Sequence, residues 1–559
     1  MLRAGAGTPR PPACPAPFIL RLKSFPSIAG LFLMALLLVS CDSGISGNPN
    51  ANQPPDTRLS VRDESLLDNL GEDERLVSTV RITWSGDDPD GFVKGYEVRF
   101  FDQTLGEEGQ DWSYTTTTDS LFLLPIRRGD RVSDVVFEVR AIDEEDLADP
   151  SPARTVYPIQ NSPPTIRISP FDLPPDTTFN VMSIGWVAED PDGDSNLARI
   201  DVSFNDSLNF VALPPDISLA TFVLPQTEPG AQGQIVDAQV FAGRGFEAIG
   251  VTVPGVRINE VNTLYVRAAD QTDTTSVRVE YSWFVKGKTS NVLYVNDFRR
   301  ATHPTVTSFH QDLLRTYLPA GTPIDIWDIT TPYTTGSSGN FPRSGLLPPT
   351  AQPSLERFML GYDYIYWVAS STTDQITGNN LPFVAPIMEP FFENGGKMMV
   401  HSPIQLPVDP EEIATNAATL LLPLNALTTF PDSLRQTLRL LSRTPVSAQN
   451  SLPGVSQSLP ELKMNGFVIN TLPYVATSSA TIPIYDAQFQ YVTRVGNRRG
   501  TWPGPSTIAS MSDDRRVALF SIPLVNEANG APLVVGADDN PDAAREAVHL
   551  ILESLGFPK

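Results

Sequence analysis

Two stretches of the chain alternate apolar and polar residues with a period of two. The first is centred on Trp84 and the second on Trp186, and in each the alternation is interrupted by Asp-Pro-Asp-Gly and then resumes. Period-two alternation on both sides of such a turn is typical of half-buried antiparallel strands. The pattern therefore predicts two antiparallel β-sandwiches, over residues 56–160 and 161–288.

The two predicted sandwiches are copies of one module. Pro-Pro opens each copy, a tryptophan marks an early strand, and Val-Arg-Ala lies in a late strand. These features resemble fibronectin type III and related immunoglobulin-like modules. The resemblance implies modules that serve as spacers or as binding platforms, and the fold alone does not decide between these roles.

The turn of the second module carries the larger number of carboxylates. Asp190, Asp192 and Asp194 are candidate metal ligands, because calcium prefers crowded oxygen atoms, and calcium is the one cofactor that the sequence suggests. A tight turn explains the same residues, since aspartate accepts backbone hydrogen bonds, proline fixes φ and glycine adopts positive φ. The Arg-Gly-Asp tripeptide over 128–130 matches a cell-adhesion motif, but a turn between strands explains it better.

From residue 291 onward the pattern changes to apolar runs that alternate with stretches of helical spacing. NVLYVNDF, YDYIYWVAS and KMMVHS are typical of buried strands, TVTSFHQDLLRTYL has helical spacing, and a long insertion rich in Pro and Thr follows the His-Ser pair. This order predicts a doubly wound parallel sheet, a flavodoxin-like α/β domain over 289–559. Polar side chains should converge at the carboxyl ends of its strands, where such folds bind ligands: Asp297, Ser370, His401 and Ser402.

The strand order, together with Gly-Gly before the His-Ser strand, resembles the class I glutamine amidotransferase-like superfamily. The resemblance implies an elbow with a nucleophilic cysteine. This domain has no cysteine, which excludes that chemistry, and Pro403 stands where the family has a small residue. The domain is therefore predicted to be non-catalytic. Ser402 with His303 as base and Asp297 as orienting acid is a weak catalytic candidate, and His401 is a weak ligand-binding candidate.

The N-terminus combines four basic residues with an apolar run that ends in Leu-Val-Ser-Cys. The run suits a signal-peptide core and is too short to span a bilayer comfortably. Its last four residues resemble the lipobox of bacterial lipoproteins. The resemblance implies a signal peptide over 1–40 and acylation of Cys41; an ordinary secretory signal with a chance cysteine is the alternative. Residues 41–55 are rich in Gly, Asn, Pro and Ser and predict a flexible tether.

Charge and the absence of other motifs limit the function. The net charge of −24 opposes binding to a phosphate backbone, which excludes nucleic acid as a partner. We expect a lipoprotein that is lipid-anchored to a membrane of the bacterial cell envelope and faces the periplasm or the cell surface. Its expected role is binding or scaffolding toward an envelope protein or a saccharide. A hydrolase acting on a saccharide or amide, and a calcium-dependent adhesin, are the alternatives.

Overall fold

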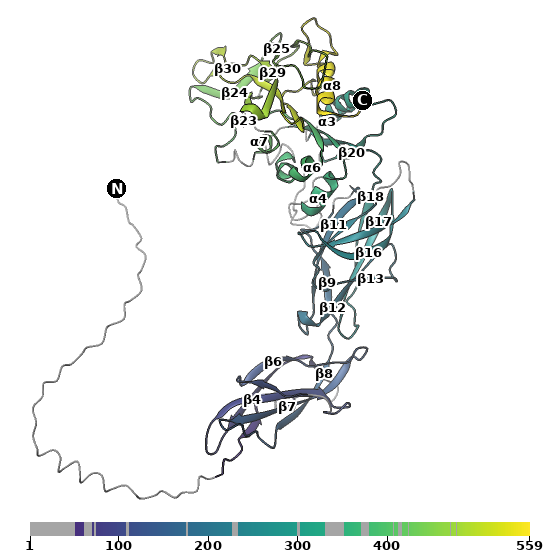
Figure 1. Cartoon of the computed structure of the whole chain (residues 1–559), viewed down its shortest axis with the longest axis vertical. Coiled ribbons are helices and arrows are strands. Elements are labelled where there is room, and N and C mark those ends of the chain that lie inside the picture. The colour runs from purple at the N-terminus through teal and green to yellow at the C-terminus, as the bar shows by residue number, and fades with distance from the viewer. Residues whose placement is uncertain are drawn as a thin grey trace, which may run out of the picture.

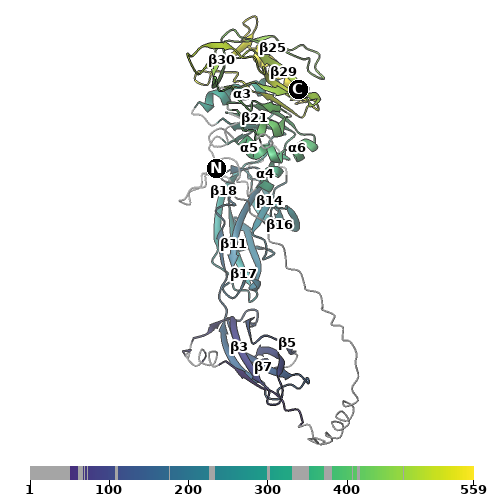
Figure 2. The same cartoon turned by 90° about the vertical axis from the view of Figure 1, so that its left-hand side faces the viewer.

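The computed structural model arranges the chain as three successive bodies, two β-sandwiches and a C-terminal domain at the far end (Figures 1 and 2). Among the described residues, no helix has both the length and the apolar character needed to cross a membrane. The structure describes residues 51–60, 67, 70–71, 74–107, 111–174, 177–225, 233–298, 302–329, 352–370, 380–405, 407–411, 416–422, 424–469, 471–476 and 478–559.

The first sandwich packs the sheet β1-β3-β6 against the sheet β2-β8-β7-β4-β5. In β3 the predicted alternation is realised, because Val80, Ile82 and Trp84 are buried and Arg81 between them is exposed. The strands are β1 (Asp56–Leu59), β2 (Leu76–Val77), β3 (Thr79–Asp87), β4 (Val93–Asp102), β5 (Ser113–Thr115), β6 (Asp119–Leu123), β7 (Val132–Asp143) and β8 (Ala153–Gln160).

The second sandwich packs the sheet β16-β15-β14-β11-β9 against the sheet β10-β18-β17-β12-β13. Strand β11 buries Trp186 as β3 buries Trp84, so the prediction of two β-sandwiches is confirmed. The strands are β9 (Thr165–Ile168), β10 (Thr177–Thr178), β11 (Val181–Glu189), β12 (Leu197–Phe204), β13 (Val211–Leu213), β14 (Leu219–Val223), β15 (Ile235–Ala242), β16 (Glu247–Arg257), β17 (Glu260–Asp270) and β18 (Val279–Val285), with the short helix η2 (Asp194–Asn196).

Five neighbouring strands of the C-terminal domain are parallel, in the order β20-β19-β21-β22-β33. Every residue of β19 is buried, as expected for a parallel strand covered on both faces. The strands are β19 (Val292–Asp297), β20 (Asp325–Asp328), β21 (Tyr364–Ala369), β22 (Lys397–His401) and β33 (Val517–Phe520), and the helices are α3 (His303–Tyr317), α4 (Gln352–Met359), α5 (Leu381–Val384), η4 (Ala385–Ile387), α6 (Glu389–Glu393), α7 (Ala417–Leu421), η6 (Ser478–Ala480) and α8 (Ala543–Leu555).

The rest of the C-terminal domain departs from the prediction. Beyond β33 the sheet continues through antiparallel strands, and a separate sheet has the order β27-β24-β30-β31. The doubly wound α/β domain predicted for 289–559 is therefore not shown, since strands predominate there. The Pro- and Thr-rich insertion disfavours helix and forms short strands with little periodic signal. The remaining strands of the domain are β23 (Leu424–Ala426), β24 (Leu434–Leu440), β25 (Pro445–Ala448), β26 (Leu462–Met464), β27 (Val468–Ile469), β28 (Tyr474–Ala476), β29 (Thr481–Ala487), β30 (Gln490–Thr493), β31 (Arg499–Thr501), β32 (Thr507–Ser512) and β34 (Val534–Gly536).

The second sandwich and the C-terminal domain share one hydrophobic core. Phe179 and Val181 of the sandwich belong to the same buried cluster as Trp327 and Phe358 of the domain. The rings of Phe179 and Phe358 are stacked, with centroids 5.3 Å apart. Because this packing is apolar and continuous, it holds the C-terminal domain directly on the end of the sandwich.

Candidate functional site

A pocket lies at the carboxyl ends of the parallel strands, where the sequence analysis placed the candidate site. Ala369 ends β21 and His401 ends β22, and both line the pocket together with His310 of α3. Its inner space is about 30 Å³, which is room for a small polar group. The other lining residues are mostly apolar: Phe298, Val306, Val368, Ser402, Pro403, Ile522, Pro523, Leu524, Val525 and Glu527.

Two histidines and a tyrosine form a hydrogen-bonded chain beside this pocket, called the imidazole chain below. The Tyr366 hydroxyl lies 2.8 Å from His401 Nε2 and 3.0 Å from His310 Nδ1. The centroids of the two imidazole rings are 4.5 Å apart. Three elements, α3, β21 and β22, thus bring together side chains that lie 35 residues or more apart in the sequence.

Burial keeps the imidazole chain uncharged. Desolvation, with a smaller contribution from the positive charge of Arg545, lowers the pKa of His310 to about 3. Desolvation also lowers the pKa of His401 well below its ordinary value, with a smaller contribution from His310. The pKa of Tyr366 is raised well above its ordinary value, again mainly by burial. At neutral pH the three groups are therefore neutral hydrogen-bonding groups.

Two polar atoms at the end of β22 are buried and have no hydrogen-bond partner among the described residues. They are His401 Nδ1 and Ser402 Oγ. His401 is 4% exposed and Ser402 is 0% exposed, whereas the backbone N–H of Ser402 does donate to Phe520 O at 3.2 Å. An unsatisfied buried polar group costs about 1–3 kcal/mol. Such groups in the wall of a pocket are suited to a ligand that completes their hydrogen bonds.

The proposed catalytic set is not assembled by the described contacts. Asp297 is fully buried and accepts hydrogen bonds from Asn380 N at 2.6 Å, Asn380 Nδ2 at 2.9 Å and Trp367 Nε1 at 3.2 Å. Its carboxylate thus fixes the start of α5. His303 is the first residue of α3, and its side chain lies outside the described part of the structure.

Sequence reasoning located His401 and Ser402 at the pocket but missed their neighbours. His310 lies within the helix α3 and Tyr366 within the buried strand β21, so neither stands at a strand end. Both are buried, at 4% and 0% exposure. No spacing in the sequence links them to His401, because they come from separate elements. Only the packing of α3 on the sheet brings them together.

The aspartates predicted as calcium ligands hold the start of the second sandwich. Asp192 is buried; its Oδ2 accepts from Ser162 N at 2.7 Å and its Oδ1 from Ser78 N at 2.9 Å. Asp190 accepts from Asp192 N at 2.8 Å, and burial is the main cause that raises its pKa. Asp194 is exposed. Within the described ranges, no group of three or more His, Cys, Asp or Glu is placed to hold a metal ion. The turn interpretation accounts for the bond from Asp192 N to Asp190, whereas the Asp192 carboxylate itself bonds residues outside the turn.

The segment that enters each sandwich is held in the same way, by an arrangement called the aspartate clamp below. In each copy an asparagine amide donates to one aspartate at 2.6 Å. The N–H of the next residue donates to a second aspartate, at 3.1 Å in the first copy and 2.7 Å in the second. The clamp consists of Asn52, Gln53, Asp90 and Asp143 in the first sandwich, and of Asn161, Ser162, Asp192 and Asp270 in the second.

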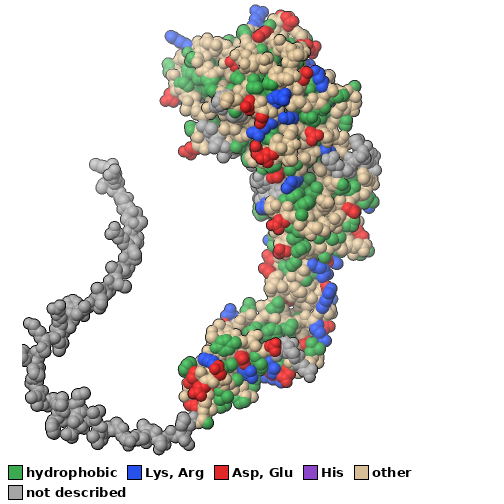
Figure 3. All heavy atoms as spheres, viewed as in Figure 1, with side chains coloured by type: hydrophobic (Ala, Val, Ile, Leu, Met, Phe, Trp, Pro, Cys, Tyr) green, Lys and Arg blue, Asp and Glu red, His purple; other side chains and the backbone are tan. Residues whose placement is uncertain are grey.

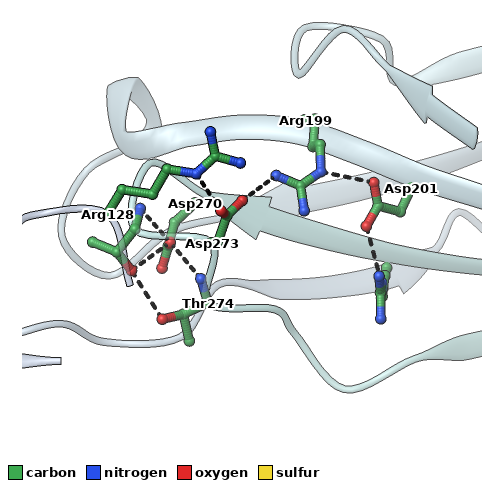
Figure 4. Close-up of polar contacts among 8 residues, drawn as sticks. Arg128, Arg199, Asp201, Asp270, Asp273 and Thr274 are labelled. Carbon is green, nitrogen blue, oxygen red and sulfur yellow. Dashed lines mark hydrogen bonds and ion pairs between the residues drawn. The ribbon is translucent and has the colours of Figure 1, made fainter. Parts of the chain in front are cut away.

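The Arg-Gly-Asp tripeptide takes part in the joint between the sandwiches. Arg128 forms an ion pair with Asp273, which also pairs with Arg199 at 2.6 Å (Figure 4). Gly129 N donates to Thr272 O at 2.9 Å. Two of the three residues of the tripeptide therefore contact the second sandwich, as expected of a turn with a structural role.

The remaining sequence predictions concern the anchor and the surface. Cys41, the predicted lipid attachment site, lies outside the described residues. Acidic and basic side chains are interspersed over the face of the molecule in Figure 3. Such a surface presents no extended basic area to a nucleic acid on that face.

Comparisons with known proteins give little beyond the sandwiches. No family model and no curated protein matches the chain. Solved structures that match include fibronectin(III)-like modules of Clostridium thermocellum CbhA (12% identity, TM-score 0.15, 42% of this chain and 95% of that chain). Others are the FN1–FN3 domains of chicken CNTN1 (11%, 0.14, 41% and 98%) and a two-domain fibronectin type III segment of chicken tenascin (12%, 0.17, 42% and 99%). Because these TM-scores are low, the description of the sandwiches rests on their own strand pairing.

Proposed function

We propose that this chain is an envelope lipoprotein that binds a small ligand in its C-terminal domain and presents that domain on two stacked sandwiches. The observation that carries the proposal is the pocket at the end of β22, where His401 Nδ1 and Ser402 Oγ are buried and have no partner in the described part of the chain. Buried polar groups in a largely apolar pocket are the usual means by which a protein orients a small ligand.

Binding is favoured over hydrolysis by the contacts around Ser402. A serine nucleophile needs a base within hydrogen-bond reach, and among the described residues no ring nitrogen contacts Ser402 Oγ. His401 is bonded through Nε2 to Tyr366, and Asp297 is engaged by Asn380. The described groups therefore suit recognition, and none of the described bases contacts Ser402 Oγ.

The stacked sandwiches suit a display role. Acylation of Cys41 would leave about ten residues before the first clamp, a span of at most about 35 Å when fully extended. From there the two sandwiches lead to the C-terminal domain at the opposite end (Figure 1). A lipid anchor at Cys41 would place the membrane at one end of the molecule and the pocket at the other, where an envelope protein or a saccharide can reach it.

The test is a thermal-shift screen of the full-length chain in detergent against saccharides, amino acids, nucleotides and divalent cations. The proposal predicts at least one ligand that raises the unfolding temperature of the wild type but not of Ser402→Ala. Ser554→Ala is the matched control, because Ser554 is also buried but bonds Pro453 O at 2.7 Å away from the pocket.

Other results of the screen would favour the alternatives. Consumption of a ligand that stops in Ser402→Ala would establish the hydrolase. A response to calcium that is confined to the sandwiches and reversed by a chelator would favour the adhesin. No shift with any ligand would contradict the binding role. For the anchor, incorporation of radiolabelled palmitate that is lost in Cys41→Ser is expected, and equal labelling of both chains would contradict it.

A further inference from the structure

The order of the groups in the imidazole chain fixes the directions of its hydrogen bonds relative to each other. A single hydroxyl, that of Tyr366, lies between two imidazole nitrogens at 2.8 and 3.0 Å. A tyrosine hydroxyl has one proton to donate, and its oxygen can also accept. It therefore donates to one histidine and accepts an N–H from the other.

Each histidine has a second ring nitrogen that does not bond Tyr366, called its outer nitrogen below: Nε2 of His310 and Nδ1 of His401. The two outer nitrogens must then differ in whether they carry a proton. The histidine that accepts from Tyr366 carries its own proton on the outer nitrogen, which becomes a donor. The histidine that donates to Tyr366 has a bare outer nitrogen, which becomes an acceptor. This holds as long as both rings are neutral, which their burial ensures. Whichever histidine the Tyr366 proton points to, one outer nitrogen of the imidazole chain is a donor and the other is an acceptor.

Both end residues of the chain, His310 and His401, line the same pocket. The one charged residue among the described lining residues is Glu527, which accepts a hydrogen bond from Thr302 Oγ1 at 3.2 Å. Among the described lining residues, none carries a fixed positive charge that would hold a carboxylate or phosphate. The small inner space of about 30 Å³ admits only a small group.

We infer that the pocket selects an uncharged group carrying a hydrogen-bond donor beside an acceptor, as a carboxamide does, and that Tyr366 is the residue that sets this selectivity. The inference rests on the proposed function and names the ligand class of the same site. Tyr366 is a positioning residue: it acts through the two histidines, whose outer nitrogens it makes complementary. A cation that can only donate hydrogen bonds, or an anion that can only accept them, can bond just one of the two outer nitrogens of the imidazole chain.

The test is nitrogen NMR of the histidine rings in the full-length chain, labelled with ¹⁵N-histidine, in detergent. The chain contains only four histidines, so the spectrum is simple. The probes are acetamide, acetate and methylammonium. We expect acetamide to shift the ring signals of His310 and His401 together, with one dissociation constant. Acetate and methylammonium should bind at least tenfold more weakly.

Tyr366→Phe and Tyr474→Phe form the matched pair of variants. Tyr474 is also a buried tyrosine whose hydroxyl bonds one side chain, that of Ser510 at 3.0 Å, and it does not line the pocket. In Tyr366→Phe the two histidines should lose their joint response to acetamide, whereas Tyr474→Phe should behave as the wild type.

Two results would overturn the inference: acetate or methylammonium binding as tightly as acetamide, or separate dissociation constants for the two histidines in the wild type. A charged ligand whose binding depends on Ser402, found in the thermal-shift screen, would also overturn the ligand class but leave the binding function intact. The absence of any ligand in both experiments would overturn the proposed function itself.

Discussion

The two sandwiches carry the same aspartate clamp, but only the clamp of the second has another domain seated on it. Asp192 is 1% exposed and accepts from both Ser162 and Ser78, whereas its counterpart Asp90 is exposed and accepts from Gln53. The hydrogen bonds are alike and the surroundings differ. The comparison teaches that the aspartate clamp fixes how the chain enters each sandwich. Where a neighbouring sandwich also excludes water from the clamp, the same hydrogen bonds form a rigid joint between the two modules.

The largest difference should appear when the acceptors themselves are removed. Asp192→Ala leaves the N–H groups of Ser78 and Ser162 unsatisfied in a buried joint, and we expect a loss of about 2–4 kcal/mol of stability. Asp90→Ala removes exposed contacts and should cost about 0.5 kcal/mol or less. Calorimetry of the two variants beside the wild type measures both effects. Equal losses would show that burial does not distinguish the two clamps.

The sandwiches and the C-terminal domain should also differ in their response to acid. All four histidines lie in the C-terminal domain. Burial lowers the folded-state pKa of His310 to about 3, below the ordinary 6.5, so the unfolded state binds more protons between these values. Stability is therefore present above pH 6.5 and lost as the pH falls toward 3, with about 2 kcal/mol lost from His310 at pH 5.

The acid response is checked by the unfolding temperature of the C-terminal transition between pH 7 and pH 5, in the wild type and in His310→Gln. The variant should show a flatter dependence on pH. A wild-type C-terminal transition that is no more sensitive than the sandwiches over this range would contradict the neutral, buried state of His310.

Two buried serines of the C-terminal domain allow a hydrogen-bonded hydroxyl to be compared with one that has no partner among the described residues. Ser554→Ala loses the bond to Pro453 O and should cost about 1 kcal/mol. Ser402→Ala removes a buried hydroxyl that has no partner among the described residues, and the unliganded chain should become more stable by about 1 kcal/mol. Urea denaturation compares the two variants. A large loss in Ser402→Ala would show that its hydroxyl has a structural role.

The smallest effect is expected for the ion pair at the joint. Arg128 is exposed over most of its side chain, with a relative exposure of 76%. Arg128→Ala should therefore cost at most about 0.5 kcal/mol, and the difference should shrink as salt is added. Thermal unfolding at low and high ionic strength checks this. If Arg128→Ala lost as much stability as Asp192→Ala, the ion pair, and not the aspartate clamp, would be the main interaction that stabilises the joint.

The sequence was informative where a single period repeated over many residues. The alternation around Trp84 and Trp186 predicted the sandwiches, and the continuous apolar runs of β19, β21 and β22 predicted strands that the structure pairs in parallel. The strands between Pro403 and β33 were not predicted. Most are only a few residues long, β27 only two, and some pair with distant partners, as β25 does with β29, so local periodicity carries little information about them.

The candidate site was predictable only in part, for a related reason. Ser402 and His401 end a strand, and strand ends are where ligands bind in such sheets, so position alone pointed to them. His310 and Tyr366 join them through distances across elements, 3.0 and 2.8 Å, that no spacing in the sequence encodes. The Asp-rich turn was ambiguous because coordinating a metal and accepting backbone N–H groups require the same carboxylates.

The central claim is that fixed joints hold the pocket-bearing domain at a set distance from the clamp of the first sandwich. Spin labels at Leu105→Cys and Val495→Cys, two exposed positions in the first sandwich and the C-terminal domain, measure that distance in the full-length chain with Cys14 and Cys41 replaced by serine. The account predicts one narrow distance distribution that broadens in Asp192→Ala. A broad distribution in the chain with Asp192 intact would contradict it.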